Sequence, residues 1–496
     1  MKHCTAFLMG LACWFGACPA LAQTRHTPPL PASVIKALRQ AQVPPQGLSV
    51  LITPLPTEPG QVPAPRLAHN EQEVVHPASV MKLFTTYAGL QLLGPDFTWR
   101  NRIYTDGPVQ GGVLQGNLIV RGSGDPKLVV ERLQDLIGQI MAQGVREVRG
   151  SIVLDRSVFD VPPRKDPFDD EPLRPYNVSP DGLLLNFKSI IYTFSPDPAN
   201  GRALVRSEPP LAGLALPADV PLRSGPCQDW RSELRADFSQ NLQTRFSGSY
   251  ASGCGERAWP VAYPHPDDYA PRVFQALWLQ AGGQLTGQVV YGATPAKATL
   301  LLEVRSLPLA EIVTDINKFS NNVMAQQLFL TLSSELGAPG RFEASRLRLD
   351  QWWRKQFPGL PAPVLDNGSG LSRSERSSAL TLTALLQRAS QGEAAQVFRN
   401  SLPIAGVDGT MARLKERQPK AAAIGKAWLK TGSLRNVASI AGYVQGDSGR
   451  QYTLVAVLNH ANAQQARPAL DALLEWTVRD ANIKAPAPPP SSTITP

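Results

Sequence analysis

Cysteine and histidine are scarce in this chain, and their scarcity excludes several kinds of site. The 496 residues contain five cysteines and six histidines. Three of the cysteines lie among the first 18 residues, which leaves Cys227 and Cys254 in the body of the chain. Metal and redox centres need ligands clustered at short spacing, and the sequence holds no such cluster. We therefore expect no metal and no cofactor, and a Cys227–Cys254 disulfide in an oxidising compartment.

Long apolar runs are missing after the first residues. Lys2 precedes the apolar segment 7–15, and Ala20-Leu21-Ala22 is a small-x-small cleavage site. We predict that residues 1–22 are a signal peptide and that the protein is exported to the periplasm. A lipoprotein signal is less favoured, because no suitable box precedes either later cysteine of this segment. No later stretch is long enough to span a bilayer, so we expect membrane association to be peripheral at most.

Clusters of one charge are absent as well. The formal net charge is +9, but the basic residues form no tract and alternate with no aromatic platform. We therefore expect no nucleic-acid binding. Attraction to an acidic cell-wall polymer or an anionic lipid fits a moderately basic surface, without specifying either partner.

The length of the chain predicts several domains. One hydrophobic core rarely organises 496 residues, which favours roughly two to four domains. The pattern from Pro468 to Ile483 predicts a helix that packs on a sheet. The proline-rich residues 485–496 are predicted to be a disordered tail.

Ser79-Val80-Met81-Lys82 is the most informative motif that is present. The apolar pattern predicts a buried helix that starts at Pro77 and ends before Gly94. Residues three apart are neighbours on a helix, so the Lys82 amine can reach the Ser79 hydroxyl. Burial and other cations would lower the pKa of Lys82, which would make a neutral amine available as general base for a serine nucleophile.

Ser-x-x-Lys alone is a weak pattern, and about one chance match is expected in a chain of this length. Ser33 to Lys36 also matches it. Val34, Ile35 and Leu38 form one apolar stripe there, which is typical of an ordinary amphipathic helix, so we assign Ser33 no chemical role. Ser79 differs because the pattern at 48–55 predicts a strand before it and because two further motifs follow.

Lys430-Thr431-Gly432, followed by Ser433, is the last of these motifs. Three strands are expected at 428–433, 437–444 and 452–458, and the first of them would face a cleft. Lys430 would direct its charge at a substrate carboxylate, and Thr431 would hydrogen-bond to it. Gly432 would allow close backbone approach, and the Ser433 N–H would join that of Ser79 as an oxyanion hole. On its own, this motif is more often an exposed strand end.

Ser320-Asn321-Asn322 opens another predicted helix. Its ordinary interpretation is an N-cap, for which serine and asparagine are preferred. Its functional interpretation gives Ser320 a proton-relay role toward a leaving amine, while Asn322 binds the substrate's amide carbonyl. Both interpretations are compatible with each other.

Longer segments of the sequence narrow the choice among the enzyme families that share these three short motifs. In this order the motifs resemble those of the low-molecular-mass class C penicillin-binding proteins, the D-alanyl-D-alanine carboxypeptidase/endopeptidases similar to penicillin-binding protein 4. The resemblance spans nearly the whole mature chain. The segments that carry it, beyond the three short motifs, are Gly116-Asn117-Leu118, Gly122-Ser123-Gly124-Asp125-Pro126, 366–373 and 402–410.

The resemblance implies a multidomain α/β fold. Its catalytic domain would be a penicillin-binding, β-lactamase-like transpeptidase unit assembled from residues 23–98 and 300–484. Residues 99–299 would form inserted, mainly β domains, with a smaller one nested at about 187–262. The long interval between Ser79 and Ser320 requires such an insertion.

The resemblance also implies the chemistry. Ser79 would attack the carbonyl next to a terminal D-alanine or a cross-link in a peptidoglycan stem peptide, and water would hydrolyse the acyl-serine. Penicillins and other β-lactams would acylate the same serine and block the enzyme. An acidic residue of the insert, for which Asp155 is the candidate, would meet the amino group of the peptide's diamino acid, and Arg373 would meet its carboxylate. The ordinary alternative for Asp155 and Arg373 is a surface ion pair or a turn.

Two other functions use the same sequence features. A β-lactamase or esterase shares the three motifs, but the large insert argues against it. A noncatalytic wall-binding protein could keep the scaffold, but a mere scaffold has no need of both Lys82 and Lys430.

Overall fold

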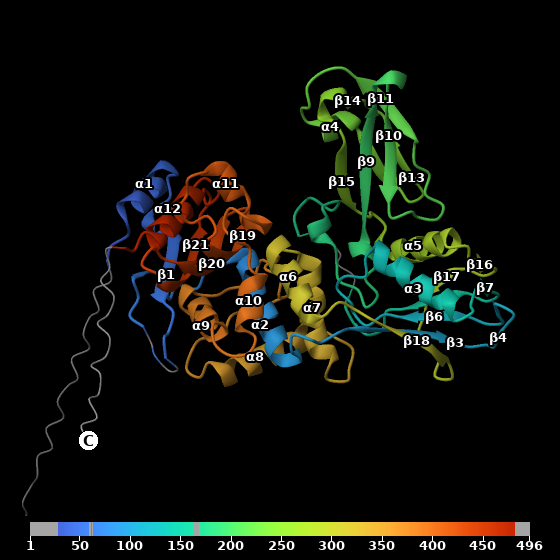
Figure 1. The fold of residues 1–496 in the computed structure, drawn as a ribbon, viewed down its shortest axis with the longest axis horizontal. Coiled ribbons are helices and arrows are strands. Elements are labelled where there is room, and N and C mark those ends of the chain that lie inside the picture. Colours follow the sequence, from blue (N-terminus) through green and yellow to red (C-terminus); the bar gives the residue numbers. More distant parts are fainter. Residues whose placement is uncertain (1–27, 59–60, 62, 163–167, 482–496) are drawn as a thin grey trace, which may run out of the picture.

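The fold was analysed in a computed structural model, which describes residues 28–58, 61, 63–162 and 168–481. The predicted signal peptide at 1–22 and the predicted tail at 485–496 lie outside these ranges. Figure 1 shows both ends of the chain, in blue and red, gathered in one body, while the middle of the chain, in cyan and green, lies beside it. The chain is a multidomain α/β protein, as expected from the sequence.

The first body is built on a five-stranded antiparallel sheet whose strands come from both ends of the chain. In strand β1 (Leu48–Pro54), Val50 and Ile52 pack on one face of the sheet and Leu51 packs on the other. Burial on both faces explains why these neighbouring positions are all apolar. The strands expected from the sequence all form. Their order is β19 (Ala427–Leu434), β20 (Val437–Gln445), β21 (Gln451–Asn459), β1 (Leu48–Pro54) and β2 (Leu67–His69).

Helices cover both faces of this sheet. On one face, α1 (Ala32–Gln40) and α12 (Arg467–Val478) pack against each other and against the sheet. Ser33 lies in α1, the amphipathic helix that the sequence predicted. The other face is covered by a helical layer that contains α2 (Lys82–Leu93), α6 (Leu309–Phe319), α7 (Asn322–Ser334), α8 (Phe342–Gln356), α9 (Ala379–Ala389) and α10 (Ala395–Ser401).

The second body comprises sheets from the middle of the chain (Figure 1). One sheet has the order β17 (Val289–Tyr291), β8 (Ile152–Asp155), β6 (Leu118–Arg121), β3 (Arg100–Thr105) and β18 (Thr299–Arg305). A smaller one has the order β16 (Gln284–Leu285), β7 (Glu147–Val148), β5 (Val113–Leu114) and β4 (Val109–Gln110). Apolar residues of α3 (Val130–Ala142) and α5 (Pro266–Gln280) share a core with these strands.

A separate sheet is formed by the segment between Ser189 and Ala262. Its order is β14 (Tyr250–Ala251), β11 (Asp219–Arg223), β10 (Arg202–Glu208), β9 (Ser189–Asp197) and β15 (Arg257–Ala262). The hairpin of β12 (Ala236–Gln240) and β13 (Gln243–Phe246) accompanies it. Cys227 and Cys254 are disulfide-bonded in this region, with their Cα atoms 4.5 Å apart.

One expected boundary differs from the strand pairing. Residue 300 was expected to begin the catalytic domain, but Thr299–Arg305 is strand β18 and pairs with β3 of the second body. The chain therefore returns to the first body only after Arg305, because the ladder of β18 belongs to the inserted sheet.

Candidate active site

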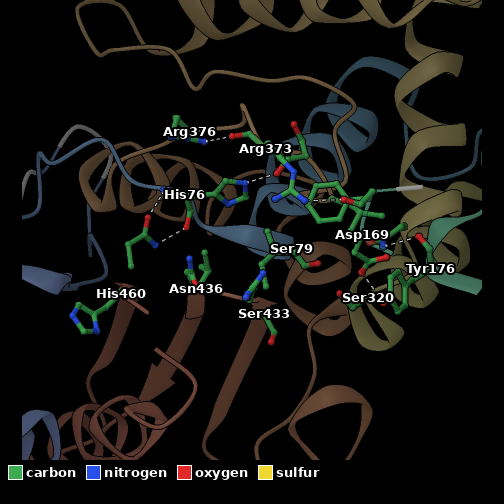
Figure 2. Close-up of a pocket in the computed structure, with 18 of the residues that line it drawn as sticks. His76, Ser79, Asp169, Tyr176, Ser320, Arg373, Arg376, Ser433, Asn436 and His460 are labelled. Carbon is green, nitrogen blue, oxygen red and sulfur yellow. Dashed lines mark hydrogen bonds between the residues drawn. The ribbon is translucent and has the colours of Figure 1, made fainter. Parts of the chain in front are cut away.

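A cleft of about 1420 Å³ opens beside Ser79. Figure 2 shows Ser79, Ser320 and Ser433 around it, with Asp169 and Tyr176 on one side and His76 and His460 on the other. Its walls come from both bodies of the molecule. Of the residues predicted from the sequence, Ser79, Ser320, Asn322, Arg373 and Ser433 line it.

Ser79 lies in the short 3-10 turn η2 (Ala78–Met81), which leads directly into α2. The helix predicted from Pro77 is therefore divided into a tight turn and an α-helix. Ala78 enters this turn with a φ of 49°, and its N–H donates to Nδ1 of His76 at 3.0 Å. The other ring nitrogen of His76 lies 2.6 Å from the carbonyl oxygen of Ser372. His76 thus holds the backbone just before the serine.

Lys82 is completely buried and contacts Ser79. Its Nζ lies 3.1 Å from Ser79 Oγ, 2.6 Å from Asn322 Oδ1 and 2.5 Å from the carbonyl oxygen of Ser369. Burial lowers the pKa of Lys82 to about 7, and the negative charge of Glu375 opposes that shift. When the amine is neutral, its two N–H groups can serve the two carbonyl oxygens, which leaves the lone pair for the Ser79 hydroxyl.

Lys430 is the second buried cation of the site. Its Nζ donates to Ser320 Oγ at 2.7 Å and to the carbonyl oxygen of Thr431 at 2.9 Å. Burial, and then the charge of Lys82, hold the pKa of Lys430 well below its usual value. The Thr431 hydroxyl donates to Thr410 Oγ1 at 2.7 Å. The Lys430-Thr431-Gly432 motif and the Ser320-Asn321-Asn322 motif are therefore joined by the hydrogen bond from Lys430 to Ser320.

Ser320 occupies the junction between two helices. It ends α6 in the left-handed conformation, with a φ of 57°, and α7 begins two residues later. The N-cap of α7 is Asn321, whose side chain accepts from the N–H of Met324. The ordinary and functional interpretations of this motif thus fall on different residues, since Asn321 caps the helix while Ser320 and Asn322 face the cleft.

Gly432 lets β19 approach the serine turn closely. A Cβ at this position would lie 2.2 Å from Ser439 Oγ and 2.6 Å from the carbonyl oxygen of Pro77. The Ser439 hydroxyl also donates to that carbonyl at 2.7 Å. Only glycine allows this packing, which brings the strand carrying Ser433 against the turn carrying Ser79.

Arg373 and Asp155, the residues expected to meet a diamino acid, lie in different places, and only Arg373 lines the cleft. Arg373 lines the cleft, donates to the carbonyl oxygen of Phe168 at 2.9 Å, and lies 4.7 Å from the centre of its ring. Asp155 does not line the cleft. Its carboxylate is 1% exposed and accepts from the N–H and hydroxyl of Thr294 and from the N–H of Ser157. We therefore correct the assignment of Asp155, because these hydrogen bonds hold it within the insert.

The acidic group at the cleft is supplied by a different segment, 168–176. Asp169 and Asp170 line the cleft together with Tyr176. Tyr176 donates its hydroxyl to Asp169 at 2.8 Å, and Asn177 donates an amide N–H to it at 2.6 Å. Burial by itself would raise the pKa of Asp169, but these hydrogen bonds lower it overall. The run of three acids at 169–171 was the available signal in the sequence.

The first body and the insert meet at Asn322. Its Nδ2 donates to the carbonyl oxygen of Tyr176 at 3.1 Å, while its Oδ1 accepts from Lys82.

Among the residues that the structure describes, no group of three histidine, cysteine, aspartate or glutamate side chains could hold a metal ion. Over the same ranges, the helices are all too short or too polar to cross a bilayer.

A serine beside a buried lysine, on a helix that covers an antiparallel sheet, defines a class of acyl-transfer enzymes that use lysine as base. The comparisons with known proteins give the family. The model of the D-Ala-D-Ala carboxypeptidase 3 (S13) family matches residues 36–479, so the chain belongs to this family and is a serine-type hydrolase. The resemblance to carboxypeptidases similar to penicillin-binding protein 4 is thereby confirmed.

Individual relatives agree. The chain is 26% identical over 409 residues to the D-alanyl-D-alanine carboxypeptidase DacB of Haemophilus influenzae, covering 79% of this chain and 82% of that protein. It is 30% identical over 408 residues to a D-alanyl-D-alanine carboxypeptidase of Actinomadura sp., covering 76% and 72% respectively. The crystal structure of penicillin-binding protein 4 from Haemophilus influenzae matches with a TM-score of 0.71 at 23% identity, over 89% of this chain and 99% of that one. The same protein in complex with a β-lactam gives 0.66 at 22%, over the same shares.

Proposed function

We propose that Ser79 carries the D-Ala-D-Ala carboxypeptidase reaction through an ester intermediate, with Lys82 as its base. The observation that carries this proposal is the position of the Lys82 amine, buried and 3.1 Å from Ser79 Oγ. Asn322 and Ser369 orient the amine, so it can take the hydroxyl proton as the oxygen attacks the carbonyl of the penultimate D-alanine. The N–H groups of Ser79 and Ser433 stabilise the oxyanion.

Departure of the terminal D-alanine needs a proton at its nitrogen. Ser320 lines the cleft and accepts a hydrogen bond from Lys430, so its hydroxyl can relay a proton to the leaving amine. Lys430 and Thr431 hold the substrate's terminal carboxylate near Ser320. Lys82 gives up the proton taken from Ser79 through the Ser320 relay to the leaving nitrogen. Water then attacks the Ser79 ester, Lys82 accepts a proton from that water and returns it to Ser79 Oγ, and the free enzyme is restored.

The substrate class is the stem peptide of peptidoglycan. Acidic and basic side chains both line the cleft, and among them Asp169 and Arg373 suit the amino and carboxylate groups of a diamino acid side chain. The amide of Asn322 binds the peptide's carbonyl. A cleft of about 1420 Å³ is larger than a dipeptide requires, which supports endopeptidase cleavage of cross-linked peptides besides carboxypeptidase trimming.

We also propose the division of labour within the chain. Residues 23–98 and those after β18, up to 484, form the catalytic domain, because β1 and β21 pair along seven residues of each strand. Residues 99–305 form the insert, with the unit at about 187–262 nested in it. The N-terminal pattern supports a periplasmic location, where the substrate lies and where Cys227 and Cys254 would oxidise.

The test is intact-protein mass over time after penicillin is added to the mature protein. β-Lactams should acylate Ser79, as the β-lactam complex of the relative supports. We expect one persistent adduct, retained in Ser33→Ala and lost in Ser79→Ala. Rapid loss of antibiotic without an adduct would instead indicate a β-lactamase. Absence of both would indicate a noncatalytic wall-binding protein.

A further inference from the structure

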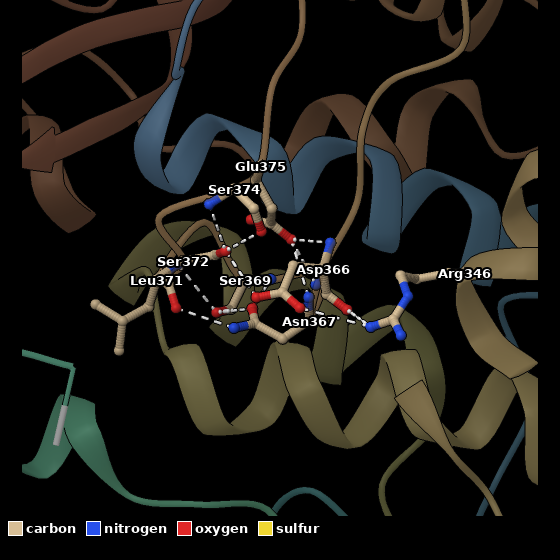
Figure 3. A network of polar contacts seen from close by, with 9 residues as sticks. Arg346, Asp366, Asn367, Ser369, Leu371, Ser372, Ser374 and Glu375 are labelled. Atoms are coloured by element: carbon tan, nitrogen blue, oxygen red, sulfur yellow. Dashed lines mark hydrogen bonds and ion pairs between the residues drawn. The ribbon is translucent and has the colours of Figure 1, made fainter. Parts of the chain in front are cut away.

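Glu375 is a completely buried acid that none of the roles above uses. Its carboxylate binds the loop 366–370 from inside (Figure 3). Oε1 accepts from the N–H groups of Asp366 at 3.1 Å, Asn367 at 3.1 Å and Gly368 at 2.8 Å. Oε2 accepts from the N–H of Gly370 at 2.7 Å. Four of the five backbone amides of this short loop therefore point at one side chain.

Only an ionised carboxylate satisfies all four donors. Burial raises the pKa of Glu375, and the backbone hydrogen bonds oppose that shift by favouring the charged form. A glutamine at this position would turn an NH₂ group toward at least one of the N–H groups and leave it unpaired. The loop is thus built around an anion, and its shape depends on that anion.

The same loop contacts the proposed base and nucleophile. The carbonyl of Ser369 accepts from Lys82 at 2.5 Å, and the carbonyl of Gly368 accepts from the Thr85 hydroxyl at 2.6 Å. A Cβ on Gly370 would lie 2.2 Å from the carbonyl oxygen of Ala78 and 2.7 Å from the N of Ser79. A shift of the loop would therefore move both the acceptor of the Lys82 amine and the backbone beside Ser79.

Few charges face the Lys82 amine. Asn322 from α7 and Ser79 from η2 are neutral. Burial and the charge of Lys82 hold the pKa of Lys430, from β19, well below its usual value, and the charge of Glu375 favours the ammonium form of Lys82. The amine lies in an apolar helical layer, where charges interact more strongly than in water. Glu375 thus affects Lys82 in two ways, through the loop and through its charge.

We propose that Glu375 is a positioning residue for Lys82: its hydrogen bonds to the loop 366–370 hold the Ser369 carbonyl on the amine, and its charge lies buried behind that loop. This inference rests on the proposed role of Lys82 as base. It assigns to the loop after α8 a part in preparing the nucleophile, in addition to the place of Arg373 in the cleft.

The experiment measures the second-order rate constant of acylation by a fluorescent penicillin as a function of pH. Only neutral Lys82 can act as base, so the rate of the wild-type protein rises with pH through the pKa of Lys82, near 7. In Glu375→Gln the anion that favours the ammonium form is removed. The rising limb of the plot of acylation rate against pH should move to lower pH by roughly 0.5 to 1 pH unit. The plateau should fall about tenfold or more, because the Ser369 carbonyl is no longer fixed.

Glu375→Asp separates the two effects. It keeps the charge but is one methylene too short to reach all four amides, so the limb should stay at the wild-type pH while the plateau falls. Asp366→Asn is the matched control, since Asp366 is a half-exposed acid of the same loop that contacts Ser372 and Arg346. It should leave the limb where it is.

Each outcome decides one point. An unmoved limb in folded Glu375→Gln would overturn the effect of the charge, and an unchanged plateau in Glu375→Asp would overturn the positioning. If Glu375→Gln does not fold, the Asp variant alone still tests the positioning. A wild-type protein without any rising limb near pH 7, or Ser79→Ala that is still acylated, would overturn the proposed function instead.

Discussion

Lys430 donates a hydrogen bond to Ser320 at 2.7 Å, which joins an edge strand of the sheet to the junction of α6 and α7. Both residues come from motifs more than 100 positions apart. The Ser320 oxygen is the acceptor in this bond, so its own proton is directed away from Lys430 and toward the cleft. This polarity is what a proton relay to a leaving amine requires.

Ser320→Ala should therefore slow acylation more than it weakens binding. We expect the rate constant for peptide cleavage to fall roughly 10²-fold or more, the usual loss when general acid catalysis is removed. The measurement is single-turnover hydrolysis of a peptide that ends in D-Ala-D-Ala. Ser334→Ala is a suitable control, because its hydroxyl bonds only within the same helix region, to Thr331. Equal rates for Ser320→Ala and the wild type would exclude the relay.

Lys82→Met should abolish the dependence on pH together with most of the activity. The pKa of the wild-type amine is about 7, so activity should fall tenfold for each pH unit below about 6 and be constant above about 8. Activity falls at low pH because protonation of Lys82 removes the lone pair that accepts the Ser79 proton. Stopped-flow acylation between pH 5 and 9 tests this. A Lys82→Met variant with the wild-type profile would show that another group titrates.

Asp169→Asn and Arg373→Ala should distinguish peptides from penicillins. Both side chains line the cleft (Figure 2), while Lys82 bonds to Ser79, Asn322 and Ser369 instead. They should therefore affect recognition of a diamino acid but not the chemistry. We expect kcat/KM for a diamino-acid stem peptide to fall about tenfold or more, with penicillin acylation within about twofold of wild type.

Asp155→Asn is the matched comparison for that experiment. Its carboxylate bonds to Thr294 and Ser157 inside the insert, so its replacement should lower stability and leave the peptide preference of the folded enzyme intact. Loss of peptide turnover in Asp155→Asn alone would reverse our correction.

Gly432→Ala should separate the strand from the serine turn. The added Cβ would come within 2.2 Å of Ser439 Oγ and 2.6 Å of the Pro77 carbonyl, so β19 must move outward. We expect acylation to slow at least tenfold while the circular dichroism spectrum stays unchanged. Ser439→Ala combined with Gly432→Ala should restore little activity, because the backbone oxygen of Pro77 cannot be removed. Full recovery in the double variant would show that the serine hydroxyl was the sole obstacle.

Spacing along single elements was predictable from the sequence. The three-residue interval between Ser79 and Lys82 places them on one side of a turn, and the structure has their side chains 3.1 Å apart. The pattern at 48–55 predicted a strand, and the structure has this strand with Val50 and Ile52 packed on one face and Leu51 on the other. The family expectation rested on the order of the motifs, and the match over residues 36–479 confirms it.

Contacts between distant segments were not predictable in this way. Asp155 was chosen because the family resemblance implies an acidic residue of the insert near the cleft, yet its carboxylate accepts from Thr294 within the insert. Asp169, by contrast, lies in a stretch without periodic pattern, and only Tyr176 and Asn177 fix its direction. Periodicity gives the face of a helix or strand, but not the direction of a loop.

The sequence by itself determined the local pieces of this protein: the buried helix of Lys82, the strands around Lys430, and the order of motifs that identifies the family. Only the tertiary structure decided that Glu375 binds the loop whose Ser369 carbonyl accepts from Lys82, and that Asp169 shares the cleft with Arg373. The physical reason is that local pieces are set by propensity and hydrophobic period. A site assembled from both ends of a chain and an insert depends instead on which loops pack together.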